Sequence, residues 1–241
     1  MKSLWNEAEA VQMASDMEQR VYSSRLLGGV PELVLHGGGN TSVKITQPNL
    51  YGEDETLLYV KGSGHDLATI DADGFAPLRL APVLRLAELE ALSDEEMANQ
   101  LRVNLTRADA PDPSVEAILH ALIPHKFVDH THSDAILAVT NTPGGVDHIR
   151  EIYGDSVVIV PYAMPGFELA RTCAQILPGA MTDQTRSVVL MQHGLFTFGD
   201  TARESYGRMI DLVTLAEDYL ASQKAWTISL PDMPMPAAEL R

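Results

Sequence analysis

Two histidines one residue apart, His130 and His132, end the short apolar run that begins at Phe127. If this run is a β-strand, successive side chains alternate between its two faces, so both imidazoles point to the same side. Two such imidazoles can bind one metal ion, and imidazole is a common ligand of zinc. An isolated pair of this kind is more often structural, with half-buried rings hydrogen-bonded to the backbone. The pair alone therefore does not establish a catalytic metal site. A third ligand and a candidate catalytic group are also needed.

A catalytic zinc site commonly takes three protein ligands and keeps one position open for substrate or water. His193 is the strongest third candidate, because it ends a predicted strand and is followed by a glycine at which the backbone can turn sharply. His120 and His125 are competitors, but a structural or surface role is favoured for each of them. The predicted metal ligands are therefore His130, His132 and His193.

Glu116 is the candidate acid/base, since it lies near the start of a predicted helix, shortly before the strand that carries the two histidines. A carboxylate that moves a proton from carbon works best in a dry pocket beside a cation, which respectively raise and lower its pKa. A lone glutamate in a first helical turn is explained by the helix macrodipole. The combination with the histidines makes Glu116 the predicted catalytic residue.

Two glycine-containing segments, residues 37–42 and 61–64, offer backbone N–H groups together with amide and hydroxyl side chains. Such groups bind anions, and a helix that begins near Ser114 would add the positive end of its dipole. Together they predict a phosphate-binding region. Neither segment has the G-x-G-x-x-G pattern or the P-loop pattern of nucleotide-binding proteins. A tight hairpin turn that needs positive φ explains each segment equally well.

Hydrophobic periodicity predicts helices and strands interspersed along the chain. The predicted helices are approximately Leu4–Leu27, Leu84–Leu92, Glu95–Leu101, Asp112–Ile123, Ser133–Val139, Phe167–Leu177 and Thr201–Lys224. The predicted strands are Leu33–Leu35, Thr41–Ile45, Leu57–Val60, Phe127–His132, Val157–Pro161, Ser187–Met191 and Leu195–Phe198, with the first two joined as a hairpin. No regular strand–helix alternation imposes a parallel sheet, so we expect α/β/α layering on a mixed or antiparallel sheet.

Composition predicts one large domain, residues 1–227, with a C-terminal tail, residues 228–241. The 17 basic and 33 acidic residues give a net charge of −16, which argues against nucleic acid or an anionic membrane as the main partner. No apolar run approaches membrane-spanning length. The single cysteine, Cys173, excludes an intramolecular disulfide, and the first residues lack the apolar stretch of a signal peptide. A cytoplasmic location is expected.

Five motifs occur in an order that resembles one known family. They are Gly38-Gly39-Asn40-Thr41-Ser42, Lys61-Gly62-Ser63-Gly64, Pro113-Ser114-Val115-Glu116, His130-Thr131-His132 and Gln192-His193-Gly194-Leu195. Over about residues 5–224 the chain looks like the class II aldolase/adducin N-terminal domain family. Within it, the chain looks closest to the aldolase half of bifunctional rhamnulose-phosphate aldolase/short-chain dehydrogenases. No dehydrogenase half is expected in these 241 residues.

The resemblance implies a three-layer α/β/α fold on a largely antiparallel mixed sheet, and a fourfold-symmetric homotetramer with sites between subunits. It implies that His130, His132 and His193 bind Zn²⁺ or another divalent metal, and that Glu116 is the acid/base. The positions that match phosphate-binding positions are Asn40, Ser42, Ser63 and Ser114, with Gly39 and Gly64 letting the backbone approach.

Two further positions bear on this resemblance. Aldolases of the family often carry two hydroxyl residues before the glutamate, whereas the second is Val115 here. A tyrosine from a neighbouring subunit protonates the aldehyde in the family, and Tyr153 is the candidate for it. The first difference weakens the prediction of phosphate recognition.

The activity implied is the reversible cleavage of a short-chain ketose 1-phosphate, of the rhamnulose- or fuculose-phosphate kind, to dihydroxyacetone phosphate and an aldehyde. Pentulose-phosphate 4-epimerases and methylthioribulose-phosphate dehydratases of the family use the same metal site and are alternatives. A non-catalytic adducin-like interaction module is a third alternative. The presence of three histidines and Glu116 argues against that module, because a scaffold does not need this set.

Overall fold

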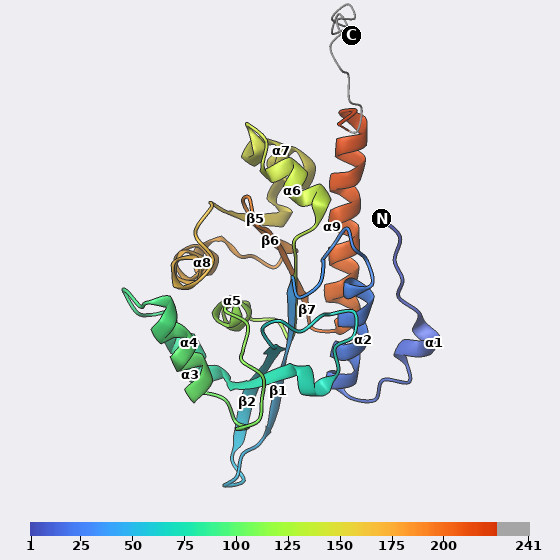
Figure 1. Ribbon diagram of the computed structural model, residues 1–241. Helices are drawn as coiled ribbons and strands as arrows, with labels where there is room; N and C mark the ends of the chain where they lie inside the picture. The colour runs from blue at the N-terminus through green and yellow to red at the C-terminus, as the bar shows by residue number, and fades with distance from the viewer. Residues whose placement is uncertain (226–241) are drawn as a thin grey trace, which may run out of the picture.

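A seven-stranded sheet forms the centre of the computed structural model, which describes residues 1–225 (Figure 1). The strand order is β3-β2-β1-β4-β7-β6-β5, and every neighbouring pair is antiparallel except β5 and β6. The strands are β1 (Asn40–Pro48), β2 (Asp54–Lys61), β3 (Phe75–Arg79), β4 (Phe127–Thr131), β5 (Val157–Val160), β6 (Ser187–Leu190) and β7 (Gly194–Gly199). The predicted tail, residues 228–241, lies outside the described residues.

Helices cover both faces of the sheet, which confirms the predicted α/β/α fold (Figure 1). One layer contains α3 (Leu80–Leu86), α4 (Asp94–Val103), α5 (Ala117–Leu122) and α8 (Phe167–Ala180). The other contains α1 (Glu7–Ala10), α2 (Asp16–Gly28), α6 (Asp134–Thr140), α7 (Gly145–Tyr153) and α9 (Ala202–Ser222), and short 3₁₀ helices occur at Ala72–Gly74 and Gly154–Ser156. Of the helices in this part of the chain, none has the length and apolar character needed to cross a membrane.

Strand β4 lies at the middle of the sheet, and its side chains alternate between the two helical layers as predicted. Val128 and His130 face the layer of α5 and α8, where His130 stacks on Phe196. Asp129 and Thr131 face the other layer and contact α2 and α9. All five residues of β4 are buried. The position of the strand therefore delivers His130 into the interior beside α5.

The predicted hairpin in the N-terminal part is wrong. Residues 33–35 form no strand, since a turn ends at Leu33 and the next two residues are irregular, and β1 pairs with β2 on one side and β4 on the other. Leu33 is completely buried, so its apolar character reflects packing rather than strand pairing. A run of three apolar residues is too short for its periodicity to distinguish a strand from a buried turn.

Three predicted helices also begin or end elsewhere, those at Leu4–Leu27, Asp112–Ile123 and Leu84–Leu92, of which the last is α3 and ends at Leu86. The first is interrupted, because Ser15 forms a capping box with Glu18 and starts α2 there. The predicted helix from Asp112 begins only at Ala117, since Pro113 pairs with Gly62 in an isolated bridge and keeps this segment extended. Helix α5 has six residues, and its N-terminus is not at Ser114. The predicted dipole contribution to an anion site at Ser114 is therefore wrong.

A buried ion pair joins the sheet to the layer of α2 and α9. Arg20 and Asp129 are both 0% exposed, and their side chains lie 2.5 Å apart. Arg20 also donates to the carbonyls of Ser42 and Val128, and the Ser205 hydroxyl donates to the second oxygen of Asp129. Both charges are compensated, so the pair connects α2, β1, β4 and α9.

Lys44 closes the C-terminal end of α5. Its Nζ donates to the carbonyls of His120, Ile123 and His125 at 2.7, 2.7 and 2.9 Å. We expect Lys44→Met to lower the free energy of unfolding by about 2–3 kcal/mol, because three carbonyls lose their shared donor. Urea denaturation measures this loss. The control Lys126→Met removes an exposed ion pair with Asp16 and should cost less than about 1 kcal/mol; equal losses would contradict the role of Lys44.

Candidate active site

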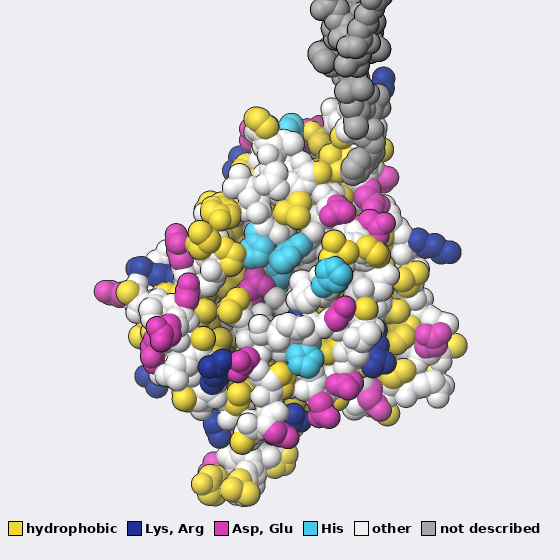
Figure 2. All heavy atoms as spheres, viewed as in Figure 1, with side chains coloured by type: hydrophobic (Ala, Val, Ile, Leu, Met, Phe, Trp, Pro, Cys, Tyr) yellow, Lys and Arg dark blue, Asp and Glu magenta, His cyan; other side chains and the backbone are white. Residues whose placement is uncertain are grey.

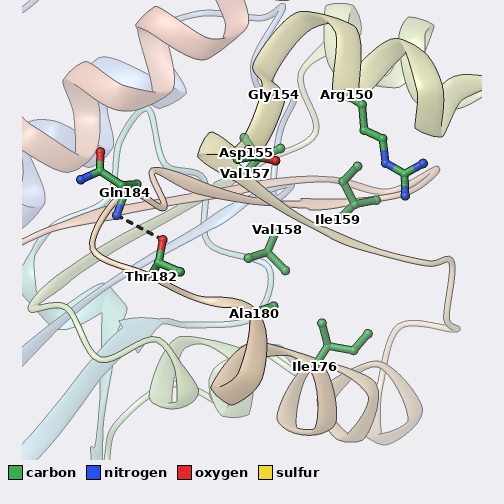
Figure 3. Close-up of a pocket in the computed structure, with 10 residues that line it drawn as sticks. All are labelled: Arg150, Gly154, Asp155, Val157, Val158, Ile159, Ile176, Ala180, Thr182 and Gln184. Atoms are coloured by element: carbon green, nitrogen blue, oxygen red, sulfur yellow. Dashed lines mark hydrogen bonds between the residues drawn. The ribbon is translucent and has the colours of Figure 1, made fainter.

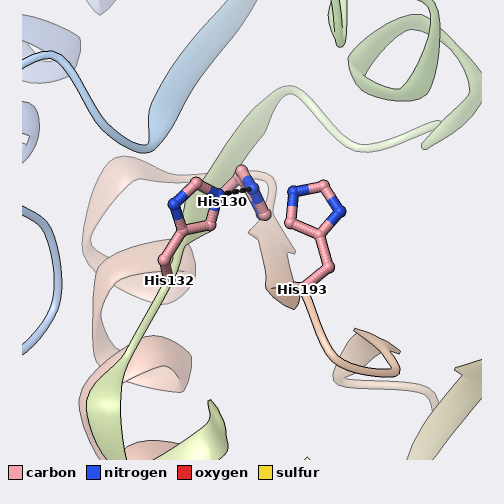
Figure 4. A group of neighbouring side chains, drawn as sticks. All are labelled: His130, His132 and His193. Carbon is pink, nitrogen blue, oxygen red and sulfur yellow. Dashed lines mark hydrogen bonds between the residues drawn. The ribbon is translucent and has the colours of Figure 1, made fainter. Parts of the chain in front are cut away.

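Three imidazoles converge beside the end of β4. The Nε2 atoms of His130 and His132 lie 3.0 Å apart, and His193 approaches them from the turn before β7 (Figure 4). One nitrogen from each ring lies within 4.8 Å of the other two. Figure 2 shows histidine side chains gathered near the middle of one face, with an acidic side chain beside them. The structure thus brings together the three predicted ligands, and this cluster can hold a metal ion.

The donor chemistry of the three rings fits a divalent metal. Nδ1 of His130 is bonded to the carbonyl oxygen of Leu195 at 3.0 Å, so it carries the proton and leaves a lone pair on Nε2. Burial, followed by the charge of His132, lowers the pKa of His130 well below its usual value. Burial also lowers the pKa of His132, and burial with His130 lowers the pKa of His193 to about 4. Near neutral pH the imidazoles are neutral, which is the form that binds metal.

Gly194 determines how His193 enters the cluster. Its φ is +158°, and a Cβ at this position would lie 2.3 Å from the carbonyl oxygen of Thr131. Only glycine fits here, because a side chain would collide with the backbone of β4. The sharp turn predicted from the glycine is therefore present, and it directs the residue before it toward His130 and His132.

Glu116 occupies the N-cap position of α5 and is 5% exposed. Its Oε2 lies 3.4 Å from Nε2 of His130, and its Oε1 lies 3.3 Å from Nε2 of His193. Asn40 Nδ2 donates to Oε2 at 2.5 Å, whereas Oε1 has no hydrogen-bond partner among residues 1–225. One carboxylate oxygen is therefore held and the other is free to exchange a proton.

The structure places Asn40 and Ser42 differently from the prediction of phosphate contact. Asn40 uses its amide on Glu116 and on His120, and Ser42 is fully buried with its hydroxyl 2.7 Å from Nδ1 of His120. Both side chains are therefore engaged by groups of the protein itself, although Asn40 Nδ2 has a second N–H. Asn40 and Ser42 are two positions apart on β1, so both side chains point to the same face, toward α5. The motif alone did not reveal this direction.

The other predicted phosphate residues lie at two adjacent turns and the segment before α5. Gly39 has φ +60°, and a Cβ there would meet Val34 at 2.5 Å, so glycine is required. Ser63 and Gly64 are exposed. Ser114 is 7% exposed, and its Oγ accepts from the backbone N–H of Glu116. Ser114 therefore lies directly beside Glu116.

Lys61 holds the two glycine turns together. Its Nζ donates to the carbonyls of Gly37 at 2.8 Å and His65 at 2.5 Å. Its side chain is almost completely buried, and burial lowers its pKa to about 8, against the opposing effect of Asp66 and Glu116. Lys61 therefore has a structural role next to the histidines, because it connects the two glycine turns.

Position resolves two further predictions, those for His125 and Tyr153, and locates Val115. His125 contacts Asp200 at the surface, as favoured for it, and Val115 is 47% exposed directly before Glu116. Tyr153 is not available as a proton donor to a neighbouring subunit, because its hydroxyl is buried and donates to the carbonyl of Leu212 at 2.7 Å. Burial raises the pKa of Tyr153 as well. The candidate tyrosine is therefore wrong.

A cavity of about 660 Å³ lies along the open edge of β5, between α7 and the end of α8 (Figure 3). Val158, Ile159 and Ile176 supply apolar walls, and Arg150 and Asp155 supply the charges. None of its lining residues belongs to the predicted site. The cavity is therefore separate from the histidine cluster.

Sequence comparison assigns the chain to a family. A model of the Class II Aldolase and Adducin N-terminal domain matches residues 18–220, and the chain belongs to this family. It is 38% identical over 221 residues to an uncharacterized oxidoreductase, YuxG, of Bacillus subtilis (strain 168). That alignment covers 91% of this chain and 32% of the relative. The chain thus spans about a third of the length of this curated relative.

Solved structures agree with this assignment. The N-terminal class II aldolase domain of a conserved protein from Thermoplasma acidophilum is 43% identical, with a TM-score of 0.83. The match covers 91% of this chain and 99% of that one. L-fuculose-1-phosphate aldolase from Thermus thermophilus is 17% identical, with a TM-score of 0.53 and coverage of 88% and 98%. At this identity the second match shows a common fold.

Proposed function

We propose that the chain is a metal-dependent aldolase that reversibly cleaves a short-chain ketose 1-phosphate to dihydroxyacetone phosphate and an aldehyde. The observation that carries this proposal is the position of Glu116, within 3.4 Å of two imidazoles of a cluster suited to a metal. Family membership supports the reaction class. The solved L-fuculose-1-phosphate aldolase of the same fold supports the kind of substrate.

His130, His132 and His193 are the proposed ligands of Zn²⁺ or another divalent ion. Such an ion supplies Lewis-acid stabilisation of the enediolate charge that develops during aldol cleavage. Oε1 of Glu116 exchanges the proton at the nucleophilic carbon, because Asn40 already holds Oε2. The burial of the carboxylate limits access of water to the reacting carbon.

The proposed phosphate region consists of Gly39, Ser63, Gly64 and Ser114. The exposed Ser63 hydroxyl and the exposed backbone of Gly64 favour this assignment, whereas the Ser63 N–H already donates to the carbonyl of Asp112. Asn40 and Ser42 are left out of it, because their side chains contact Glu116 and His120. A homotetramer and a cytoplasmic location remain part of the proposal, and native mass spectrometry tests the former.

A panel of L-rhamnulose 1-phosphate, L-fuculose 1-phosphate and L-ribulose 5-phosphate tests the reaction. We expect release of dihydroxyacetone phosphate from at least one ketose 1-phosphate, measured with a coupled reductase. Epimerised pentulose phosphate without carbon–carbon cleavage would instead identify a 4-epimerase. No turnover of any compound by metal-loaded protein would overturn the proposed function.

Metal content tests the ligand set separately from turnover. After loading with Zn²⁺ and dialysis, the protein should retain about one ion per chain, and His193→Ala should weaken binding by more than about tenfold. Elemental analysis and competition with a chelating dye measure both. His125→Ala is the control, since His125 lies at the surface beside Asp200. Equal zinc affinity of His193→Ala and the control would contradict the assignment and favour an adducin-like module.

A further inference from the structure

Four buried side chains form one hydrogen-bonded chain between β1 and α5. Ser42 Oγ lies 2.7 Å from His120 Nδ1, His120 Nε2 contacts Asn40 Oδ1, and Asn40 Nδ2 lies 2.5 Å from Glu116 Oε2. Ser42 and His120 are 0% exposed, and Asn40 and Glu116 are 6% and 5% exposed. Every link is removed from solvent, so the side chains themselves determine which group donates.

The direction of donation follows from the orientation of the Asn40 amide. Its Nδ2 donates to Glu116 Oε2, and its Oδ1 faces His120 Nε2. An amide oxygen only accepts, so His120 carries its proton on Nε2. The Nδ1 atom of His120 then accepts from the hydroxyl of Ser42. A single arrangement of protons satisfies the whole chain.

His120 makes no direct contact with the proposed reacting atoms. Its Nε2 contacts Asn40 Oδ1, and this contact fixes the orientation of the Asn40 side chain. We infer that His120 is a positioning residue for Glu116, acting through Asn40; the inference rests on the proposed function of Glu116 as acid/base. His120 lies one helical turn after Glu116, and its backbone N–H donates to the Glu116 carbonyl at 3.2 Å. Asn40 pairs with His130 across β1 and β4, so the same residue aligns the carboxylate with the histidine cluster.

Two substitutions at His120 test the inference. His120→Leu should lower kcat by about 10- to 100-fold, because an unheld carboxylate leaves the productive geometry. KM should change by less than about twofold, since His120 does not reach the turns that face substrate. His120→Gln keeps a donor for Asn40 and should restore most of kcat. His125→Leu, a surface histidine, is the matched control and should behave as wild type.

A double-mutant cycle separates positioning from general stability. In a Glu116→Gln background, His120→Leu should cause no further loss of kcat, because both changes act on the same carboxylate. Multiplying losses, or a normal kcat in His120→Leu, would overturn the inference. If His120→Leu does not fold, Ser42→Ala takes its place in the cycle, since it removes the donor to His120 Nδ1.

A spectroscopic measurement tests the role of His120 without an activity assay. ¹⁵N NMR of the zinc-loaded wild-type chain should find His120 neutral and protonated on Nε2 at pH 7. An Nδ1–H tautomer or an imidazolium would overturn the inference alone. Absence of cleavage with every ketose phosphate would overturn the proposed function and, with it, the role of His120.

Discussion

Glu116→Gln is expected to lower kcat for ketose-phosphate cleavage by about 10²- to 10⁴-fold, the usual contribution of a general acid/base. Glutamine keeps the size of the side chain and can still contact Asn40, but Oε1 no longer exchanges a proton. KM should stay within about twofold, because the turns that face the substrate are unchanged. Steady-state kinetics with the best substrate of the panel measure both constants.

The control measurements are the zinc content and the unfolding midpoint of the Glu116→Gln variant itself. The variant should bind zinc as wild type does, since no proposed ligand is removed, and its unfolding midpoint should not fall. A fully active Glu116→Gln would exclude Glu116 as the acid/base. A variant that is inactive because it has lost zinc would instead indicate a role in metal binding.

Asp129→Ala is expected to lower the free energy of unfolding by about 3–5 kcal/mol. It leaves the Arg20 guanidinium fully buried without a countercharge, between β1, β4 and α9. It also removes the acceptor of the Ser205 hydroxyl. Urea denaturation followed by circular dichroism measures the loss.

Two comparisons make the Asp129 prediction specific. Asp147→Ala breaks an exposed ion pair with Arg150 and should cost less than about 1 kcal/mol. The double variant Arg20→Met/Asp129→Leu removes both charges and should recover part of the loss, because apolar replacement of a whole buried pair is often tolerated. A loss below about 1 kcal/mol in Asp129→Ala would show that Arg20 finds solvent or another partner.

Elements with long or strongly apolar patterns were predictable from the sequence. The strand that carries His130, the apolar strands β5 and β6, and the long helix α9 with its Thr201 cap all lie where periodicity places them. Hydrophobic pattern and capping act locally, so they can be recognised without knowing the fold. The layered architecture followed from the order of these elements.

Features that depend on contacts distant in the sequence were not predictable. Arg20 and Asp129 are 109 positions apart, and only a charged residue inside the apolar β4 run indicated that a partner was needed. The pairing of Gly62 with Pro113, which delays the start of α5, is likewise non-local. The Ser15-x-x-Glu18 capping box was a local signal that could have located the start of α2.

In the candidate site, too, local patterns were predictable and long-range contacts were not. Spacing and motif order indicated the three histidines and Glu116, which the structure brings together. The same motifs suggested phosphate contact for Asn40 and Ser42, whereas the fold directs both side chains toward His120. Motifs identify which residues belong to a region, but the facing of each side chain depends on strand register and on the helix packed above it.

The most direct test of the account is cleavage of a ketose 1-phosphate by the same protein sample before chelation, after chelation and after addition of Zn²⁺. Release of dihydroxyacetone phosphate should stop on chelation and return on addition of the metal, and Glu116→Gln should stay near background throughout. Cleavage that persists in the chelated sample with unchanged kcat would contradict the account.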